Sequence, residues 1–270
     1  MNARAGLPAL LLLLTAAACS SSGSPSGALP GQSDRTAASE GVVRIADEAR
    51  LRGDTTTAVA LYRQAVLASP ANPTLLVKLG DALMATGAYE QAGGAYRMAV
   101  EHAPDSEPGL VGLGSAEIAL GRASDAIDPL QRATGLAPAD IRARRNLAVA
   151  FDLAGRHDDA KTLYAAALHA APDDVDVKSD YALSLALTGE KDRAVQMMRE
   201  VAASPLASPR HQRNLVLVLG LAGQGDEART LANRTLPAGD AASLMARITA
   251  LQAMSGPAEQ AAALGTAAGG

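Results

Sequence analysis

Large apolar residues recur every 34 residues between positions 39 and 239. One stands in each period, at Ile45, Leu79, Leu113, Leu147, Tyr181 and Leu215, and the next position is small in five of the six periods. A second bulky residue follows later in most periods, at Tyr62, Tyr96, Leu130, Tyr164 and Met198. This pattern predicts two helices per period, with the small positions letting the second helix approach the first closely.

Glycine, alanine and proline keep the same 34-residue step. The glycines are Gly53, Gly87, Gly121, Gly155, Gly189 and Gly223; the alanines five residues later are Ala58, Ala92, Ala126, Ala160, Ala194 and Ala228; the prolines are Pro70, Pro104, Pro138 and Pro172. Glycine ends a helix at low cost in the left-handed conformation, and proline cannot continue one. We therefore expect the first helix of each period to end at the glycine and the second just before the proline.

This period and its landmarks resemble the tetratricopeptide repeat (TPR). The resemblance implies an all-α, right-handed solenoid of about six helix-turn-helix repeats across residues 39–239, beginning at Ser39, Pro73, Glu107, Ile141, Val175 and Pro209. Residues 240–254 carry apolar side chains on one helical face, so we expect a capping helix that covers the last apolar edge. Residues 255–270 are rich in Ala and Gly, which predicts a disordered tail.

The amino terminus has the features of a targeting segment. Arg4 precedes an apolar run that ends at Ala18 and is too short to span a bilayer as a helix. Leu14–Cys19 resembles a bacterial lipobox, with Ala16 where leucine is usual. That resemblance implies a signal peptide over residues 1–18, lipidation of Cys19 and, with Ser20 next, an outer-membrane location facing the periplasm.

Ordinary secretion is the alternative. Ala16–Ala18 also fits the small-x-small rule for signal-peptide cleavage, which would leave a soluble periplasmic protein. In either case residues 19–38 are rich in Ser, Gly and Pro, so we expect a flexible tether with a reach of about 25 Å.

Composition excludes several functional classes. Only 2% of residues are aromatic, so the core must be aliphatic and small, which suits packed helices. A net charge of −4 does not fit a nucleic-acid binder, and one cysteine excludes a disulfide framework.

No catalytic pattern stands out in the chain. P-loop, HExxH and GxSxG motifs are missing from the sequence, and the four histidines, at positions 102, 157, 169 and 211, lack ligand spacing. We therefore expect no enzyme, no cofactor, no metal site and no small-molecule substrate.

The TPR resemblance implies that the first helix of each repeat lines a concave groove. In the last three repeats the groove positions carry arginines and amides over an apolar floor. The candidate partner-binding residues are Arg142, Arg145, Asn146, Val149, Ser179, Asp180, Leu183, Arg210, Arg213, Asn214 and Leu217. Amides can bond a peptide backbone and arginines can bind a carboxylate, so an extended or helical peptide of a protein partner is expected here. These side chains could instead only solvate the face, with Asp176 and Asp180 pairing across repeats.

A chaperone-type carboxylate clamp does not fit the sequence. That TPR pattern needs cations in the repeat that follows Asn146, and Asp176 and Asp180 stand there instead. The groove is therefore expected to bind a different kind of partner.

Three segments resemble the TadD-like lipoproteins of Tad (Flp) pilus assembly: residues 145–168, 181–195 and 208–229. The resemblance implies a pilotin-like interaction scaffold that acts on the pilus secretin or another assembly component. Two alternatives stay open: a pilotin of another type IV pilus or secretion system, and an envelope adaptor that regulates peptidoglycan enzymes.

Lipidation of Cys19 gives a direct test. Palmitate labelling of the wild-type protein is expected to be lost in Cys19→Ser, because the thiol is the only site that can carry the anchor. Intact mass of the mature protein checks the same point: a mass without added acyl chains would favour ordinary secretion.

Overall fold

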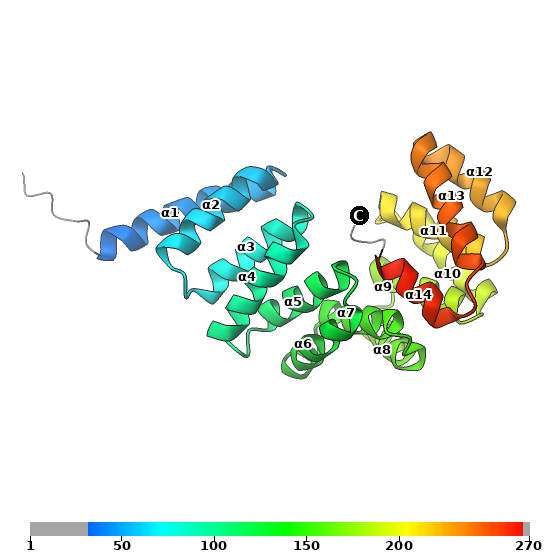
Figure 1. Ribbon diagram of the computed structural model, residues 1–270, viewed down its shortest axis with the longest axis horizontal. Helices are drawn as coiled ribbons and strands as arrows, with labels where there is room; N and C mark the ends of the chain where they lie inside the picture. Colours follow the sequence, from blue (N-terminus) through cyan, green and yellow to red (C-terminus); the bar gives the residue numbers. More distant parts are fainter. Residues whose placement is uncertain (1–31, 267–270) are drawn as a thin grey trace, which may run out of the picture.

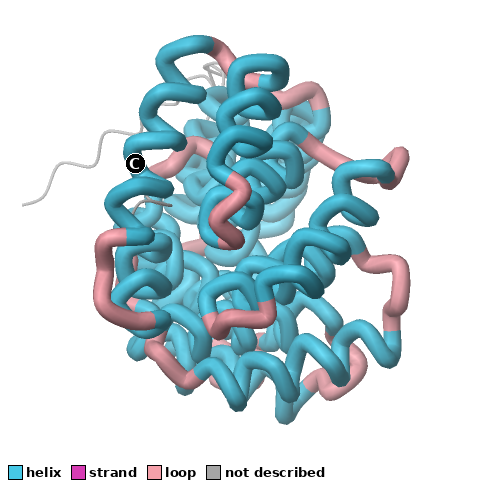
Figure 2. Tube along the Cα trace, turned by 90° about the vertical axis from the view of Figure 1, so that its right-hand side faces the viewer, coloured by secondary structure: helices cyan, strands magenta, loops and turns pink. Residues whose placement is uncertain are grey.

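A computed structural model describes residues 32–266, and their regular structure is entirely helical (Figures 1 and 2). Twelve helices form six consecutive pairs: α1 (Gln32–Leu51) with α2 (Thr55–Ala68), α3 (Pro73–Ala85) with α4 (Tyr89–His102), α5 (Glu107–Ala119) with α6 (Ala123–Leu136), α7 (Ile141–Leu153) with α8 (His157–Ala170), α9 (Val175–Leu187) with α10 (Lys191–Ala203), and α11 (Pro209–Leu221) with α12 (Gly225–Thr235). The pairs follow one another along an arc, as the solenoid predicted from the sequence requires (Figure 1).

The repeated glycines make the turn inside each pair. All six, from Gly53 to Gly223, have φ between 72° and 92°, the left-handed conformation that glycine adopts most easily. At the first turn the N–H of Asp54 donates to the carbonyl of Ala49, and Gly53 donates to Arg50. This is the hydrogen-bond pattern that closes a helix at a left-handed residue. The positions predicted as helix ends are therefore confirmed.

The small positions are occupied by side chains of the second helices. The ring of Tyr96 is 2% exposed and lies where a Cβ on Gly80 or Gly112 would stand, within 2.6 and 2.2 Å. Leu130 fills the corresponding space at Gly114, with an atom 2.4 Å from the Cβ position. The core is thus built by one bulky residue per repeat entering a gap left by small residues.

The first helix begins earlier than expected. Residues 32–38, assigned to the flexible tether from composition, belong to α1, which starts at Gln32. The reason lies in the local sequence: Pro30 and Gly31 are the last helix breakers before residue 40, and the segment between contains none. The signal peptide, Cys19 and the rest of the tether lie outside the described residues.

Two further helices follow the repeats. α13 (Ala238–Gln252) packs on α11 and α12, and it buries Ala241, Ile248 and Leu251 where the capping helix was expected. α14 (Pro257–Thr266) corrects the prediction of a disordered tail. Proline at its first position and Glu259 in its first turn favour a helix start, and these signals outweigh the Ala/Gly-rich composition.

Within residues 32–266, no helix combines the length and apolar character that a bilayer crossing demands.

Gly112 provides a test of the packing. Gly112→Ala is expected to destabilise the protein by about 1–3 kcal/mol, because the new methyl group overlaps the buried Tyr96 ring. Gly94→Ala is the matched control: it lies within helix α4 with nothing within 4 Å of its Cβ position, so it should stabilise by up to about 1 kcal/mol. Chemical denaturation measures both, and equal effects would contradict the packing scheme.

Candidate partner-binding groove

A cavity of about 730 Å³ opens on the inner side of the last repeats. Side chains from α5, α7, α8, α9, α11, α13 and α14 line it. Of the eleven residues predicted for the groove, ten lie on its wall: Arg142, Arg145, Asn146, Val149, Asp180, Leu183, Arg210, Arg213, Asn214 and Leu217. Residues up to 75 positions apart in the sequence are thereby gathered around one space.

Ser179 is the exception, and its placement corrects the prediction. It is fully buried between repeats and does not line the cavity. Its hydroxyl accepts a hydrogen bond from Nδ2 of Asn214 at 2.9 Å. Asn146, two repeats earlier, makes the equivalent bond: it donates to the hydroxyl of Ser115 at 2.8 Å. Each asparagine therefore uses one amide N–H to join neighbouring repeats, and its second N–H and Oδ1 are left to meet a partner.

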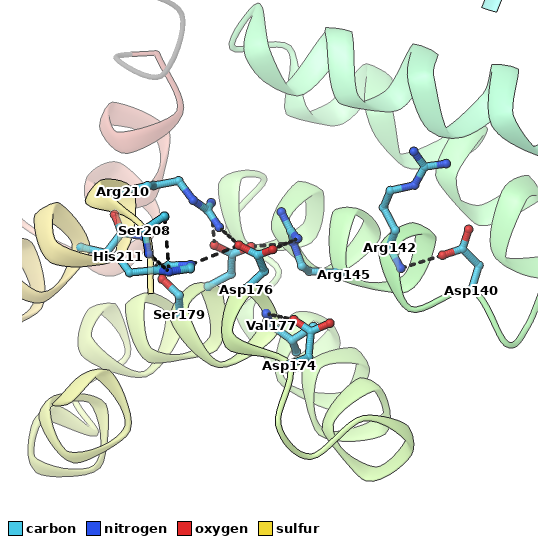
Figure 3. Close-up of polar contacts among 12 residues, drawn as sticks. Asp140, Arg142, Arg145, Asp174, Asp176, Val177, Ser179, Ser208, Arg210 and His211 are labelled. Carbon is cyan, nitrogen blue, oxygen red and sulfur yellow. Dashed lines mark hydrogen bonds and ion pairs between the residues drawn. The ribbon is translucent and has the colours of Figure 1, made fainter. Parts of the chain in front are cut away.

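Two aspartates and two arginines form an ion network across α7, α9 and α11 (Figure 3). Nε of Arg145 lies 2.9 Å from Oδ2 of Asp180, and Arg145 also reaches Asp176 at 3.5 Å. Arg210 contacts both aspartates from the other side. The pairing of Asp176 and Asp180 across repeats, which the sequence left as an alternative, is therefore present.

The Arg145–Asp180 contact is close without being a well-aligned hydrogen bond. The N–H at Nε is buried and does not point at a partner oxygen, so the contact is an ion pair. Arg145 and Arg210 are engaged within the fold, which leaves them less free to bind a partner carboxylate than the sequence suggested.

The pKa values of Asp176 and Asp180 are shifted in opposite directions. Burial opposes ionisation of Asp176, but Arg145 and Arg210 beside it outweigh burial and lower its pKa. Burial is more complete at Asp180 and raises the pKa of that carboxyl despite the same two arginines. The network is thus anchored on Asp176, whose ionised form the folded state favours.

Arg142 and Arg213 are the cations most accessible to a partner. Arg213 is paired with Asp240 at 3.3 Å, and both side chains are more than half exposed. The guanidinium of Arg142 points away from the ion network (Figure 3), and it makes no hydrogen bond or ion pair within the described part of the chain. Both arginines line the cavity, so a partner can reach them at little cost in desolvation.

The cavity wall is completed by residues that the sequence did not single out. Arg247 of α13 and Ala261 and Leu264 of α14 lie on the cavity wall. The spacing of Ala258, Ala261 and Leu264 after Pro257 is a helical signal that could have revealed them. It does not show which surface that helix covers.

A buried polar cluster also lies on the cavity wall. Asp152 is 6% exposed and accepts from the hydroxyl of Ser184 at 2.9 Å, with Nδ1 of His157 also at 2.9 Å. Burial raises the pKa of Asp152, although His157 and Ser184 act in the opposite sense. These contacts satisfy a buried carboxyl, and the bond from Ser184 joins α9 to α7 of the preceding repeat.

The residue types of a hydrolase triad meet at Ser208, His211 and Asp176, but their hydrogen bonds are not those of a triad (Figure 3). Nδ1 of His211 accepts from the backbone N–H of Ser208 at 3.0 Å, so Nε2 carries the proton that faces Asp176 at 3.1 Å. The lone pair that would activate Ser208, whose hydroxyl lies 3.4 Å away, is already used. The serine and histidine form a capping box at the start of α11.

No group of three or more potential ligands for a metal ion occurs among the described residues.

Removal of Asp176 tests the network. Asp176→Ala is expected to destabilise the protein by about 1–3 kcal/mol at neutral pH, chiefly because the buried N–H of His211 loses its acceptor. The pKa of Asp176 is lowered in the folded state. Its contribution to the free energy of unfolding is therefore present above the unfolded pKa of about 3.9 and is lost as pH falls through the folded pKa. The free energy of unfolding, measured by denaturation at several pH values between 3 and 7, should therefore change less with pH in the variant than in the wild type.

Asp173→Ala is the control. It removes an exposed carboxylate 3.8 Å from Lys178 and should change stability by under about 0.5 kcal/mol.

Comparison with known proteins agrees with this architecture. A tetratricopeptide repeat family model matches residues 49–113, 117–179 and 153–216, together more than half of the chain. The crystal structure of MamA protein is similar at 28% identity and a TM-score of 0.52, over 60% of this chain and 89% of that one. A search of curated proteins found no match.

The solved structures of PilW and PilF share the fold. PilW, described as a widely conserved type IV pilus biogenesis factor, aligns with a TM-score of 0.62 and 16% identity over 73% of this chain and 91% of its own. Pseudomonas aeruginosa PilF aligns with a TM-score of 0.57 and 19% identity over 74% and 91%. The repeat geometry, the family match and these structures lead to one conclusion: the chain belongs to the tetratricopeptide repeat family.

Proposed function

We propose that this protein is a non-enzymatic scaffold, lipid-anchored to the periplasmic face of the outer membrane, that acts in Tad (Flp) pilus assembly as a pilotin-like factor for the secretin. The observation that carries the proposal is the cavity on the inner side of the last repeats, where ten predicted groove residues converge. A concave surface with an apolar floor and accessible cations is the usual site of partner binding in helical solenoids.

The three segments that resemble TadD-like lipoproteins supply most of the residues that line this groove. Residues 145–168, 181–195 and 208–229 supply parts of α7 to α12, including the floor residues Val149, Leu183 and Leu217. The fold shared with PilW and PilF supports a pilus role in general terms. The lipobox-like segment at Cys19 supports the anchor.

Arg142 and Arg213 are the residues to change, because neither holds the repeats together. In the full-length protein, Arg142→Glu with Arg213→Glu should lower capture of the secretin from detergent-solubilised envelopes at least about tenfold, since two accessible cations become anions. Secretin multimers and assembled pili should fall with it. Quantitative immunoblotting of the secretin measures the effect.

The matched control is Arg229→Glu with Arg234→Glu. Both arginines lie on the exposed face of α12 and line no part of the cavity, so the change in charge is the same and capture should be unaffected. Normal secretin multimers and pili in a deletion strain would contradict the proposed role. Capture of a peptidoglycan hydrolase or synthase in place of the secretin would favour the envelope-adaptor alternative.

A further inference from the structure

The last helix does not extend the solenoid; it turns back into the concave face. α14 packs against α7, α5 and α9, the first helices of three different repeats, and Figure 1 shows it leaving the end of the arc toward α9. Ala261 is completely buried there, and Ala261 and Leu264 lie on the cavity wall. At the start of the helix, the Cβ of Ala258 lies 3.1 Å from where a Cβ on Gly155 would stand. α14 therefore covers part of the groove with a face of small residues.

A few contacts hold α14 in place. Arg247 donates from its guanidinium to the carbonyl of Leu264 at 2.9 Å, near the end of the helix. That carbonyl is among the last four of the helix, which have no partner within it, and a cation is favourable at this end. At the other end Gln260 donates to the carbonyl of Leu251 at 2.9 Å.

These contacts are few compared with those of the repeats. Among its described side chains only Ala261 is fully buried, and a helix of ten residues is marginal in water by itself. The link from α13 is short and contains Gly256. α14 therefore binds the groove through a small interface, like a ligand. The short link to α13 keeps it close to the groove.

The asparagines of the groove favour a helical occupant over an extended one. Asn146 and Asn214 each use one amide N–H on Ser115 and Ser179, so only one donor on each is left for an extended backbone. A helix satisfies its own backbone and needs only a matching surface and a partner for its last carbonyls. Arg247 supplies that partner on the cavity wall.

We propose that α14 is an internal ligand of the groove, and that the binding partner is a short helix with small apolar residues on one face that takes its place and sets its carboxyl-terminal end on Arg247. The proposal rests on the groove being the partner site. Ala258, Ala261 and Leu264 define the face that such a helix presents, one residue every third position.

Thiol labelling in the full chain tests whether α14 opens. In a Cys19→Ser background, a cysteine is placed at one of three alanines: Ala261, on the buried face of α14; Ala262, exposed on the same helix; or Ala167, buried in α8 within the core. Labelling of Ala261→Cys is expected to be at least about tenfold slower than Ala262→Cys and at least about tenfold faster than Ala167→Cys, because α14 opens without global unfolding. Adding Arg247→Ala should speed labelling at position 261 about tenfold, whereas Arg229→Ala should not.

A peptide tests whether the groove accepts a helix in trans. The probe is the fluorescent, end-blocked peptide PAEQAAALGT, residues 257–266, with a scrambled sequence as control. By fluorescence anisotropy it should bind the full-length Ala261→Glu variant at least about tenfold more tightly than wild type, because the buried glutamate expels the tethered copy. If that variant does not fold, Arg247→Ala takes its place in the same comparison.

Two labelling results would overturn the proposal. If position 261 is labelled as slowly as position 167, α14 is a fixed part of the core. If position 261 is labelled as fast as position 262, α14 does not occupy the groove. Equal binding of the ordered and scrambled peptides, or equal binding to variant and wild type, would overturn it as well. These measurements use no secretin, so their failure is distinct from failure of the pilus role.

Discussion

The structure depends on one packing interaction: a bulky side chain of most second helices enters a gap left by small residues of the first helices. Tyr96 shows it most fully, because its ring lies against Gly80 of its own repeat and Gly112 of the next. Its hydroxyl donates to Asp81 at 2.6 Å, so the polar end is satisfied as well. One side chain thus joins a repeat internally and to its neighbour, which is how an elongated protein with few aromatic residues forms a cooperative core.

The ends of the solenoid follow from the same interaction. Ile45 occupies the large apolar position of the first repeat, but no earlier repeat among the described residues covers it and it is 49% exposed. At the other end α13 supplies the missing neighbour: Ile248 lies where a Cβ on Gly220 would stand, within 2.5 Å. The capping helix therefore completes the last repeat in the way that a following repeat would.

Stacking of the repeats also creates the groove and limits what it can bind. Side chains at equivalent positions of α7, α9 and α11 are brought side by side, and many of their polar groups pair with each other across repeats. The groove that remains combines an apolar floor with Arg142, Arg213 and Arg247. α14 shows the kind of surface that fits this space: a helix with a face of alanines.

The sequence by itself determined the all-helical class, the six repeats, the left-handed glycines and half of the residues around the cavity, because a 34-residue period repeats the same local chemistry six times. Local pattern could not decide which polar groups pair, since Arg145, Asp176 and Arg210 meet only when three repeats stack. Nor could it place α14. Its alanine spacing predicts a helix at most, and only the curvature of the solenoid sets α7 and α9 where that helix can bury Ala261.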